Sequence, residues 1–276
     1  MSWWRRMRRA PPGSAVTLLA VCSAFVALPA AAQDRPFVFS VATARPTAAT
    51  RGTMLRVDYD LGGGERMFQQ DRGDRPEQQV TVQAARGRLL MIGRMNFVSS
   101  AGRFETASSG EVLMSVRQGG RTGMALAAGG GMLHEAGGTN VLLARVTGSH
   151  EAEAWRLHGN LLMQKPFGPA RDALYLITTV GWARRVTPAF ALGVETVAED
   201  LEGFWDPAEA EGGARILVGP SLHFAPAGRP WQIVATGGPT FHPADTGRSS
   251  GAIRDLPPSR DRVAYAVKVA LTYRVF

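Results

Sequence analysis

Residues 261–276 read DRVAYAVKVALTYRVF, and this stretch decides the fold class. Large apolar side chains occupy alternate positions in it: Val263, Tyr265, Val267, Val269, Leu271 and Tyr273. The positions between them hold small, polar or charged side chains, Lys268 among them. A two-residue period is that of a β-strand, so the pattern predicts a strand with one apolar face and one small or charged face.

The chain then ends on an aromatic residue, Phe276, shortly after Tyr273. A final strand of this kind resembles the closing strand of Gram-negative outer-membrane β-barrels. In that family the terminal aromatic is part of the signal read by the barrel-assembly machinery, so the resemblance implies this machinery as a partner of the C-terminal strand. Tyr273 and Phe276 are three residues apart, so we expect a bulge or a freed terminal residue between them.

The N-terminus has the pattern of a secretory signal peptide. Four arginines precede an apolar run over residues 15–28, and small residues follow up to Ala32. The run is shorter than the roughly 20 residues of a spanning helix. We therefore expect residues 1–32 to be cleaved, with an uncleaved anchor as the alternative.

The only cysteine, Cys22, lies in this leader, and Val21 before it is too large for a lipoprotein signal. The mature chain then has no disulfide and no thiolate metal site. The formal net charge is +8, but four positive charges belong to the leader, which leaves the mature chain nearer +4. No basic stripe with interleaved aromatics is present, so nucleic acid is not an expected partner.

The period-two pattern continues through the rest of the chain. Residues 33–50 contain two prolines and little pattern, which indicates a periplasmic lead-in or a short plug. The barrel is expected over residues 51–276, where about twelve segments alternate. They are residues 55–61, 79–83, 89–97, 111–117, 122–133, 140–148, 153–164, 172–184, 188–198, 214–224, 231–241 and 263–273.

The connections between these segments also alternate in length. Residues 62–78, 199–213 and 242–260 are long and polar, whereas 118–121, 185–188 and 226–229 are short and rich in turn formers. With twelve strands, all long connections fall on one side and both chain ends on the other. The sequence therefore predicts an all-β fold, a single antiparallel up-and-down transmembrane β-barrel, with ten strands as the alternative because 122–133 is rich in glycine.

One face of these strands carries almost all the charge. If the apolar face meets lipid, the charged face lines the lumen, whereas a soluble barrel would reverse the two faces. The leader, the connection lengths and the terminal aromatic favour the membrane barrel over a soluble periplasmic β protein. The candidate lumen-lining residues are Arg56, Asp58, Arg94, Glu111, Arg117, Arg145, Arg156, His158, Glu195, Arg215 and Lys268.

These side chains support two interpretations of the lumen. An open lumen in which arginines outnumber acids favours small polar or anionic solutes, which makes a passive outer-membrane pore the first hypothesis. The same charges can instead pair across the lumen and plug it, giving a structural barrel. An outer-membrane enzyme acting on lipids or proteins is a third hypothesis, but no set of nucleophile, histidine and acid can be assembled from the sequence.

No cofactor or metal is expected. His134-Glu135 begins like a zinc-protease motif, but Gly138 stands where the second histidine is needed. His150 and His158 lie near two glutamates without a diagnostic spacing. Residues 199–206 are acidic and aromatic and fit a solvated extracellular loop better than a cation site bridging lipopolysaccharide.

Aromatic residues complete the membrane interpretation. The sequence predicts lipid-facing girdles near the strand ends, formed by Trp155, Trp182, Trp231, Tyr59 and Tyr273. Outer-membrane lipid and lipopolysaccharide are thus expected to surround the barrel, in the outer membrane of a Gram-negative bacterium. The sequence leaves the oligomeric state open.

Overall fold

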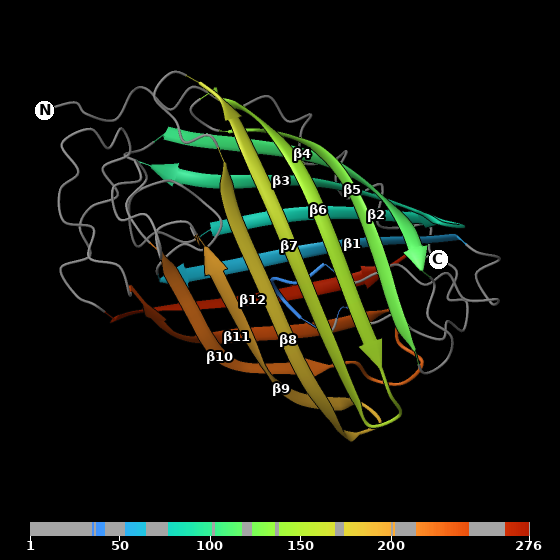
Figure 1. The fold of residues 1–276 in the computed structure, drawn as a ribbon. Helices are drawn as coiled ribbons and strands as arrows, with labels where there is room; N and C mark the ends of the chain where they lie inside the picture. Colours follow the sequence, from blue (N-terminus) through green and yellow to red (C-terminus); the bar gives the residue numbers. More distant parts are fainter. Residues whose placement is uncertain are drawn as a thin grey trace, which may run out of the picture.

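The computed structural model describes the barrel and a short segment before it (Figure 1). The described residues are 35, 37–41, 53–64, 77–100, 103–117, 123–135, 138–168, 174–199, 201, 214–242 and 263–275. Among them no helix is long and apolar enough to cross a membrane. The expected bulge or freed residue at Phe276 lies outside the described residues.

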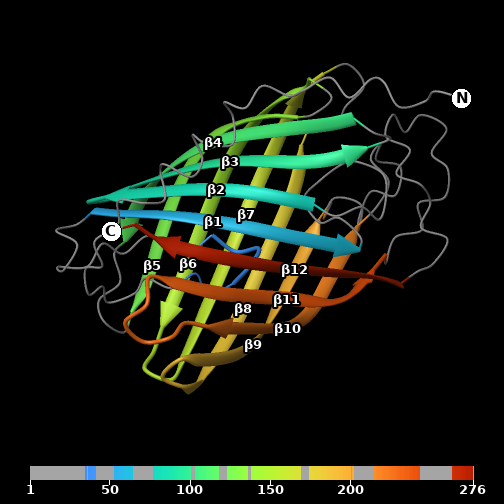
Figure 2. The ribbon, with the colours of Figure 1, turned by 180° about the vertical axis from the view of Figure 1, so that it is seen from behind.

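Twelve strands form one closed barrel in which every strand is antiparallel to both neighbours. Each strand pairs with the next along the chain, and β12 pairs with β1 to close the ring (Figures 1 and 2). The strands are β1 Thr53–Gly64, β2 Glu77–Arg86, β3 Leu89–Ser100, β4 Arg103–Arg117, β5 Met124–His134, β6 Asn140–Glu151, β7 Trp155–Phe167, β8 Tyr175–Thr187, β9 Phe190–Glu199, β10 Arg215–Phe224, β11 Trp231–Phe241 and β12 Val263–Arg274.

This topology confirms the all-β up-and-down barrel and the count of twelve, and the ten-strand alternative is wrong. The glycine-rich stretch is a full strand, β5, paired along its length with β4 and β6. A Cβ at Gly129 or Gly131 would overlap the β4 backbone, because the two strands approach closely there. Glycine thus allows the two backbones to approach closely. The same glycines remove the alternation of apolar and polar side chains by which a strand is predicted from sequence.

Short turns join four pairs of strands at one end of the barrel, which we call the turn end. The pairs β2–β3, β6–β7, β8–β9 and β10–β11 are joined there, and β1 begins and β12 ends there. The turn at residues 87–88, weak in the sequence pattern, is a tight hairpin with Gly87 at a φ of 60°. The opposite end, which we call the loop end, is where residues 65–76, 200–214 and 242–262 connect strands.

The outer face of the barrel is apolar. In β6 the exposed positions include Leu142 and Val146, which are 46% and 52% exposed, and in β12 Val267 is 55% exposed. The alternate positions in the same strands point inward and are buried. A continuous band of exposed large apolar side chains around a closed barrel is the surface of a membrane-spanning barrel, since water would make it an aggregation site.

Aromatic side chains lie at both rims of this band, with one departure from the sequence pattern. Trp155 and Trp231 begin their strands and Tyr273 lies near the end of β12, so all three are at the turn end. At the loop end, Phe167, Phe241 and Tyr265 are exposed. Tyr59 and Trp182 lie instead in the middle of β1 and β8, so the girdle prediction is wrong for these two.

The barrel interior is packed and partly apolar. One buried apolar cluster joins β5–β10 and β12 and includes Leu143, Ile177 and Leu217. A second one joins β2–β5 and includes Leu90 and Leu113. The sequence missed these inward apolar positions because they lie on the same face as the charges, and alternation alone predicts one uniformly polar face.

Candidate functional site

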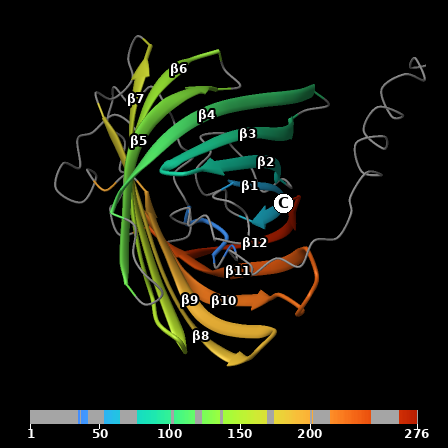
Figure 3. The same ribbon diagram turned by 90° about the vertical axis from the view of Figure 1, so that its right-hand side faces the viewer.

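A short stretch of chain before β1 lies inside the barrel. It comprises Arg35 and Phe37–Val41, and we call it the lumen segment. Figure 3 shows it in blue, surrounded by the ring of strands. Phe37 and Val38 are 0% and 3% exposed, so the segment is enclosed on all sides rather than lying across an open mouth. Residues 36 and 42–50 lie outside the described residues, so the predicted lead-in or plug is observed only in this part.

The carboxylate of Glu195 on β9 holds the middle of the lumen segment. Its Oε1 accepts hydrogen bonds from the backbone N–H of Phe39 at 2.8 Å and of Ser40 at 3.0 Å. Its Oε2 accepts from the backbone N–H of Val38 at 3.1 Å and from Thr236 Oγ1 at 2.8 Å. Glu195 is fully buried, so the side chain expected to line a pore is instead hydrogen-bonded to backbone donors of the chain's own segment.

Arg35 anchors the start of the lumen segment. Its guanidinium binds both carboxylate oxygens of Asp60 on β1, with Nη1–Oδ1 at 2.6 Å and Nη2–Oδ2 at 2.9 Å. Its Nη1 also lies 3.7 Å from the carboxylate of Asp58. Burial alone would lower the pKa of Arg35, but the carboxylates of Asp60 and Asp58 outweigh it and raise that pKa. Arg35 is therefore charged and bound in a bidentate pair.

The same group of charges extends along β1 and β12. Arg56 Nε lies 3.2 Å from Asp58, and Thr272 Oγ1 donates to Asp58 at 2.6 Å. Lys268 Nζ lies 3.8 Å from Asp60 and 5.6 Å from the centre of the Phe39 ring. Two acids and three cations thus meet at the seam where β12 closes the barrel on β1.

Polar side chains of β6, β7 and β8 hold the end of the lumen segment. The backbone N–H of Val41 donates to Asn160 Oδ1 at 3.1 Å, and its carbonyl accepts from Thr147 Oγ1 at 3.0 Å. Ser40 Oγ lies 3.0 Å from Thr179 Oγ1. The wall therefore satisfies the backbone N–H groups of residues 38–41 and the carbonyl of Val41, as burial requires.

Phe37 fills the space beside β7 and β8. Its ring meets the His158 ring edge to face at 5.4 Å between centroids. A Cβ at Gly181 would lie 2.6 Å from the Phe37 ring, so the missing side chain at Gly181 makes the room for this ring. His158 is itself buried, with Nε2 3.7 Å from Glu151, and therefore faces the segment rather than a water-filled pore.

Two further ion-pair groups lie in the lumen away from the segment. Arg145 donates two hydrogen bonds to the carboxylate of Glu111 on β4, from Nε to Oε2 at 2.6 Å and from Nη2 to Oε1 at 3.0 Å. Arg94 also binds this carboxylate. Arg215 Nη2 on β10 lies 2.8 Å from the carboxylate of Glu199 on β9. Both glutamates have fully buried side chains, and arginines of other strands compensate their charges.

Nine of the eleven candidates therefore lie in one packed interior, among them His158, Glu195 and Lys268. Arg156 lies at the turn end, where it lines a cavity. Arg117 is exposed there, because β4 carries a register shift between Ser115 and Arg117 that breaks the alternation.

Sequence reasoning missed two acids of the site and the role of the lumen segment. Asp60 shares the charged face of residues 55–61 with Arg56 and Asp58, but it is not among the eleven candidate lumen-lining residues. Glu199 was placed at the start of a loop, whereas it is the last residue of β9 and is buried. The rest of the acidic stretch, apart from Leu201, lies outside the described residues. The only signal for the segment was the short apolar run Phe37–Val41, which fits many structures equally well.

Within the described ranges, no group of three histidine, cysteine, aspartate or glutamate side chains is placed to hold a metal ion. His134 lies at the loop end of β5 and contacts Asn140 at 2.9 Å. His150 stacks at 5.0 Å on Trp155, between β6 and β7. These histidines therefore have local packing roles at the barrel rims.

No protein-family model matches the chain, and no curated protein matches its sequence. Among solved structures it is similar to the KdgM porin, with 10% identity, a TM-score of 0.48, and coverage of 79% of this chain and 98% of the porin. It is also similar to OmpT of Vibrio cholerae, with 10% identity, a TM-score of 0.41, and coverage of 80% and 96%. A bacterial polysaccharide outer-membrane secretin gives 6% identity, a TM-score of 0.42, and coverage of 80% and 98%.

Similarity at this level concerns the fold alone. The chain's own geometry shows a closed antiparallel barrel of twelve strands with an apolar outer surface. That architecture is consistent with a porin-like protein of the outer membrane.

Proposed function

We propose that this porin-like barrel is an outer-membrane channel for small polar or anionic solutes, and that its own lumen segment closes the path. The observation that carries the proposal is the binding of Glu195 to three successive backbone N–H groups of the segment. Because the Glu195 carboxylate of the wall holds the lumen segment by hydrogen bonds alone, the segment can leave the lumen without breaking the wall.

The way the segment is held supports a removable closure. Its side-chain contacts come from β1, β6, β7, β8, β9 and β12, but it adds no strand to the barrel. The backbone ladders that close the wall are complete without it. Its departure would therefore expose Asp60, Glu195 and their neighbours to water while the barrel stays closed.

Localisation and surroundings belong to the same proposal. Export by a leader cleaved after Ala32 would leave the lumen segment near the new N-terminus, with the turn end in the periplasm. Lipid and lipopolysaccharide would surround the apolar band, and the C-terminal strand would engage the assembly machinery. Outer-membrane fractionation and N-terminal sequencing of the exported protein test this part separately from conduction.

Planar-bilayer conductance tests the channel. We expect the exported wild-type protein to conduct poorly and a variant lacking residues 35–41 to form steady, larger pores with a preference for anions. Heat-modifiable gel mobility must show that both variants are folded barrels. If the folded deletion variant conducts no more than wild type, the closure is not the lumen segment.

A structural barrel is the second candidate, and the Glu111 cluster favours it. Arg94 on β3 and Arg145 on β6 bind Glu111 on β4, and these pairs do not involve the lumen segment. A barrel closed by such pairs stays silent after the deletion. Neutral variants of Glu111, Arg94 and Arg145 made together would then be needed to open it.

A further inference from the structure

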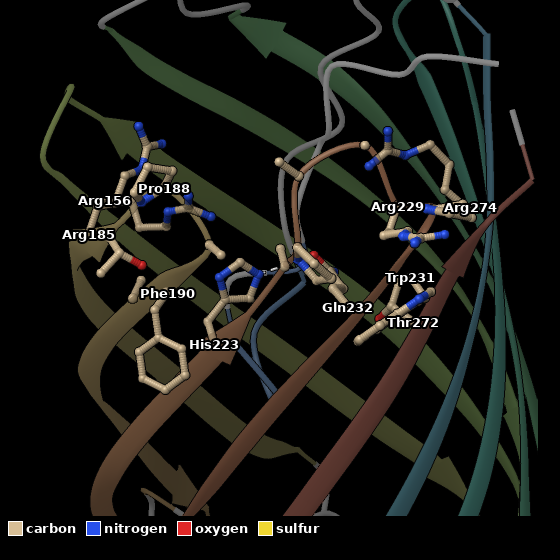
Figure 4. A pocket seen from close by; sticks show the side chains of 18 of the residues that line it. Arg156, Arg185, Pro188, Phe190, His223, Arg229, Trp231, Gln232, Thr272 and Arg274 are labelled. Carbon is tan, nitrogen blue, oxygen red and sulfur yellow. Dashed lines mark hydrogen bonds between the residues drawn. The ribbon is translucent and has the colours of Figure 1, made fainter. Parts of the chain in front are cut away.

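A cavity of about 210 Å³ lies at the turn end, between the β8–β9 and β10–β11 turns (Figure 4). Its lining includes five arginines and, among the described residues, no aspartate or glutamate. The arginines are Arg56, Arg156, Arg185, Arg229 and Arg274. A concave site lined by one sign of charge concentrates the positive potential and attracts anions.

The arginines come from separate parts of the barrel. Figure 4 shows Arg156 and Arg185 on one side of the cavity and Arg229 and Arg274 on the other. Arg56 is the most buried of the five and is bound to Asp58. Guanidinium groups on opposite walls can bind different oxygens of one ligand at the same time.

Gln232 gives an independent indication of a ligand. It lines the cavity and is 5% exposed, and its Oε1 lies 3.1 Å from Nε2 of His223. An amide oxygen only accepts, so His223 donates from Nε2. The amide nitrogen of Gln232 takes no part in this hydrogen bond. That buried nitrogen has no hydrogen-bond partner among the described residues. A buried donor needs an acceptor, and here a ligand oxygen in the cavity would supply it.

We propose that this cavity binds a small oxyanion carrying at least two negative charges. Arg156, Arg185, Arg229 and Arg274 supply the charge, and the Gln232 amide supplies a directed hydrogen bond. The volume is that of roughly seven water molecules in the liquid, which suits an anion the size of pyrophosphate or a tricarboxylate. The site does not depend on whether the lumen conducts, so it can exist in either the channel or the structural barrel.

Isothermal titration calorimetry on the folded barrel in a zwitterionic detergent at low salt tests the site. Pyrophosphate is the first probe and citrate the second, so the two arms separate a phosphate site from a carboxylate site. We expect saturable one-to-one binding, weakened at least tenfold by Arg185→Gln and by Gln232→Glu. Gln232→Glu nearly keeps the shape of the side chain but replaces its donor with an acceptor.

Arg88→Gln is the matched control. Arg88 is also exposed in a turn at the same end, between β2 and β3, but does not line the cavity. Its affinity should equal that of wild type. Absence of saturable binding of both probes, or equal losses in Arg88→Gln and Arg185→Gln, would overturn the proposal in favour of diffuse attraction to a basic rim. If Gln232→Glu does not fold, the exposed Arg185 still decides the outcome.

Discussion

Glu195 makes the largest number of hydrogen bonds that any single wall side chain forms to the described lumen segment. Its two oxygens accept from three backbone N–H groups and from Thr236, and Ser40 Oγ lies 3.3 Å away as a further donor. Hydrogen bonds to a charged group contribute about 1.5–3 kcal/mol each. The segment's position is therefore more sensitive to this carboxylate than to any single apolar contact.

Replacing Glu195 with glutamine should loosen the lumen segment without changing the size of the side chain. The amide has one acceptor oxygen, and its NH₂ group faces donors, so at least two bonds are lost. A loss of about 1.4 kcal/mol changes an equilibrium tenfold. We expect the open probability in planar bilayers to rise at least tenfold in Glu195→Gln.

Glu199→Gln is the control for that experiment. Glu199 lies on the same strand and is equally buried, but its ion pair is with Arg215 of the wall. It should leave the open probability near that of wild type. An equal rise in both variants would mean that general loss of luminal charge, rather than release of the segment, opens the barrel.

The Phe37 contact gives a test that changes no charge. Gly181→Ala places a Cβ 2.6 Å from the Phe37 ring, so the ring or the β8 backbone must move. We expect raised conductance, as for Glu195→Gln. Gly159→Ala is the matched control on the adjacent strand, since its Cβ would meet only a carbonyl oxygen at 3.8 Å.

At the level of elements, the strands could be predicted from the sequence, whereas the position of the lumen segment could not. Most strands repeat an alternation along their length, which is why Val263–Arg274 and most other strands were predicted correctly. The segment is a few residues long, and its polar contacts are made by its backbone, which has the same chemistry in every sequence. No pattern of side chains can therefore indicate where such a segment binds.

A disulfide can lock the lumen segment in place. Cys22 is the only cysteine of the sequence, and Ser40 Oγ lies 3.0 Å from Thr179 Oγ1, so the double variant Ser40→Cys with Thr179→Cys has the proximity that a disulfide requires. We expect low conductance under oxidising conditions and wild-type or higher conductance after reduction. The two single variants should not respond to reductant, and a locked barrel that conducts freely would show that solutes pass beside the segment.

At the level of the molecule, the apolar band predicts how charge is tolerated on the outside. Val146 lies in the middle of β6 and Val116 next to the turn end of β4, and both are more than half exposed. We expect Val146→Arg to cost about 2–4 kcal/mol of folding free energy in a bilayer, and Val116→Arg about 0–1 kcal/mol. Chemical denaturation in lipid vesicles measures both; equal costs would contradict a membrane-spanning band.

The whole-molecule features of the sequence were sufficient for the barrel but not for its interior. Alternation and connection lengths predicted twelve strands and the face of Glu111, Glu195 and Lys268. They did not predict which charge pairs with which, because partners such as Arg145 and Glu111 are joined only by the register between strands. The register shift before Arg117 shows the limit of predicting faces from alternation. One extra residue in β4 places Arg117 on a different face from the one that the alternation predicts.

The position of the lumen segment also has a consequence for the order of biogenesis. Its hydrogen bonds join residues up to 157 positions apart, and its contacts involve strands from β1 to β12 around the ring. Its binding site therefore does not exist until nearly all of the wall has assembled. The segment precedes every strand in the chain, so it is synthesised before the wall that it binds and reaches its native place after that wall has formed.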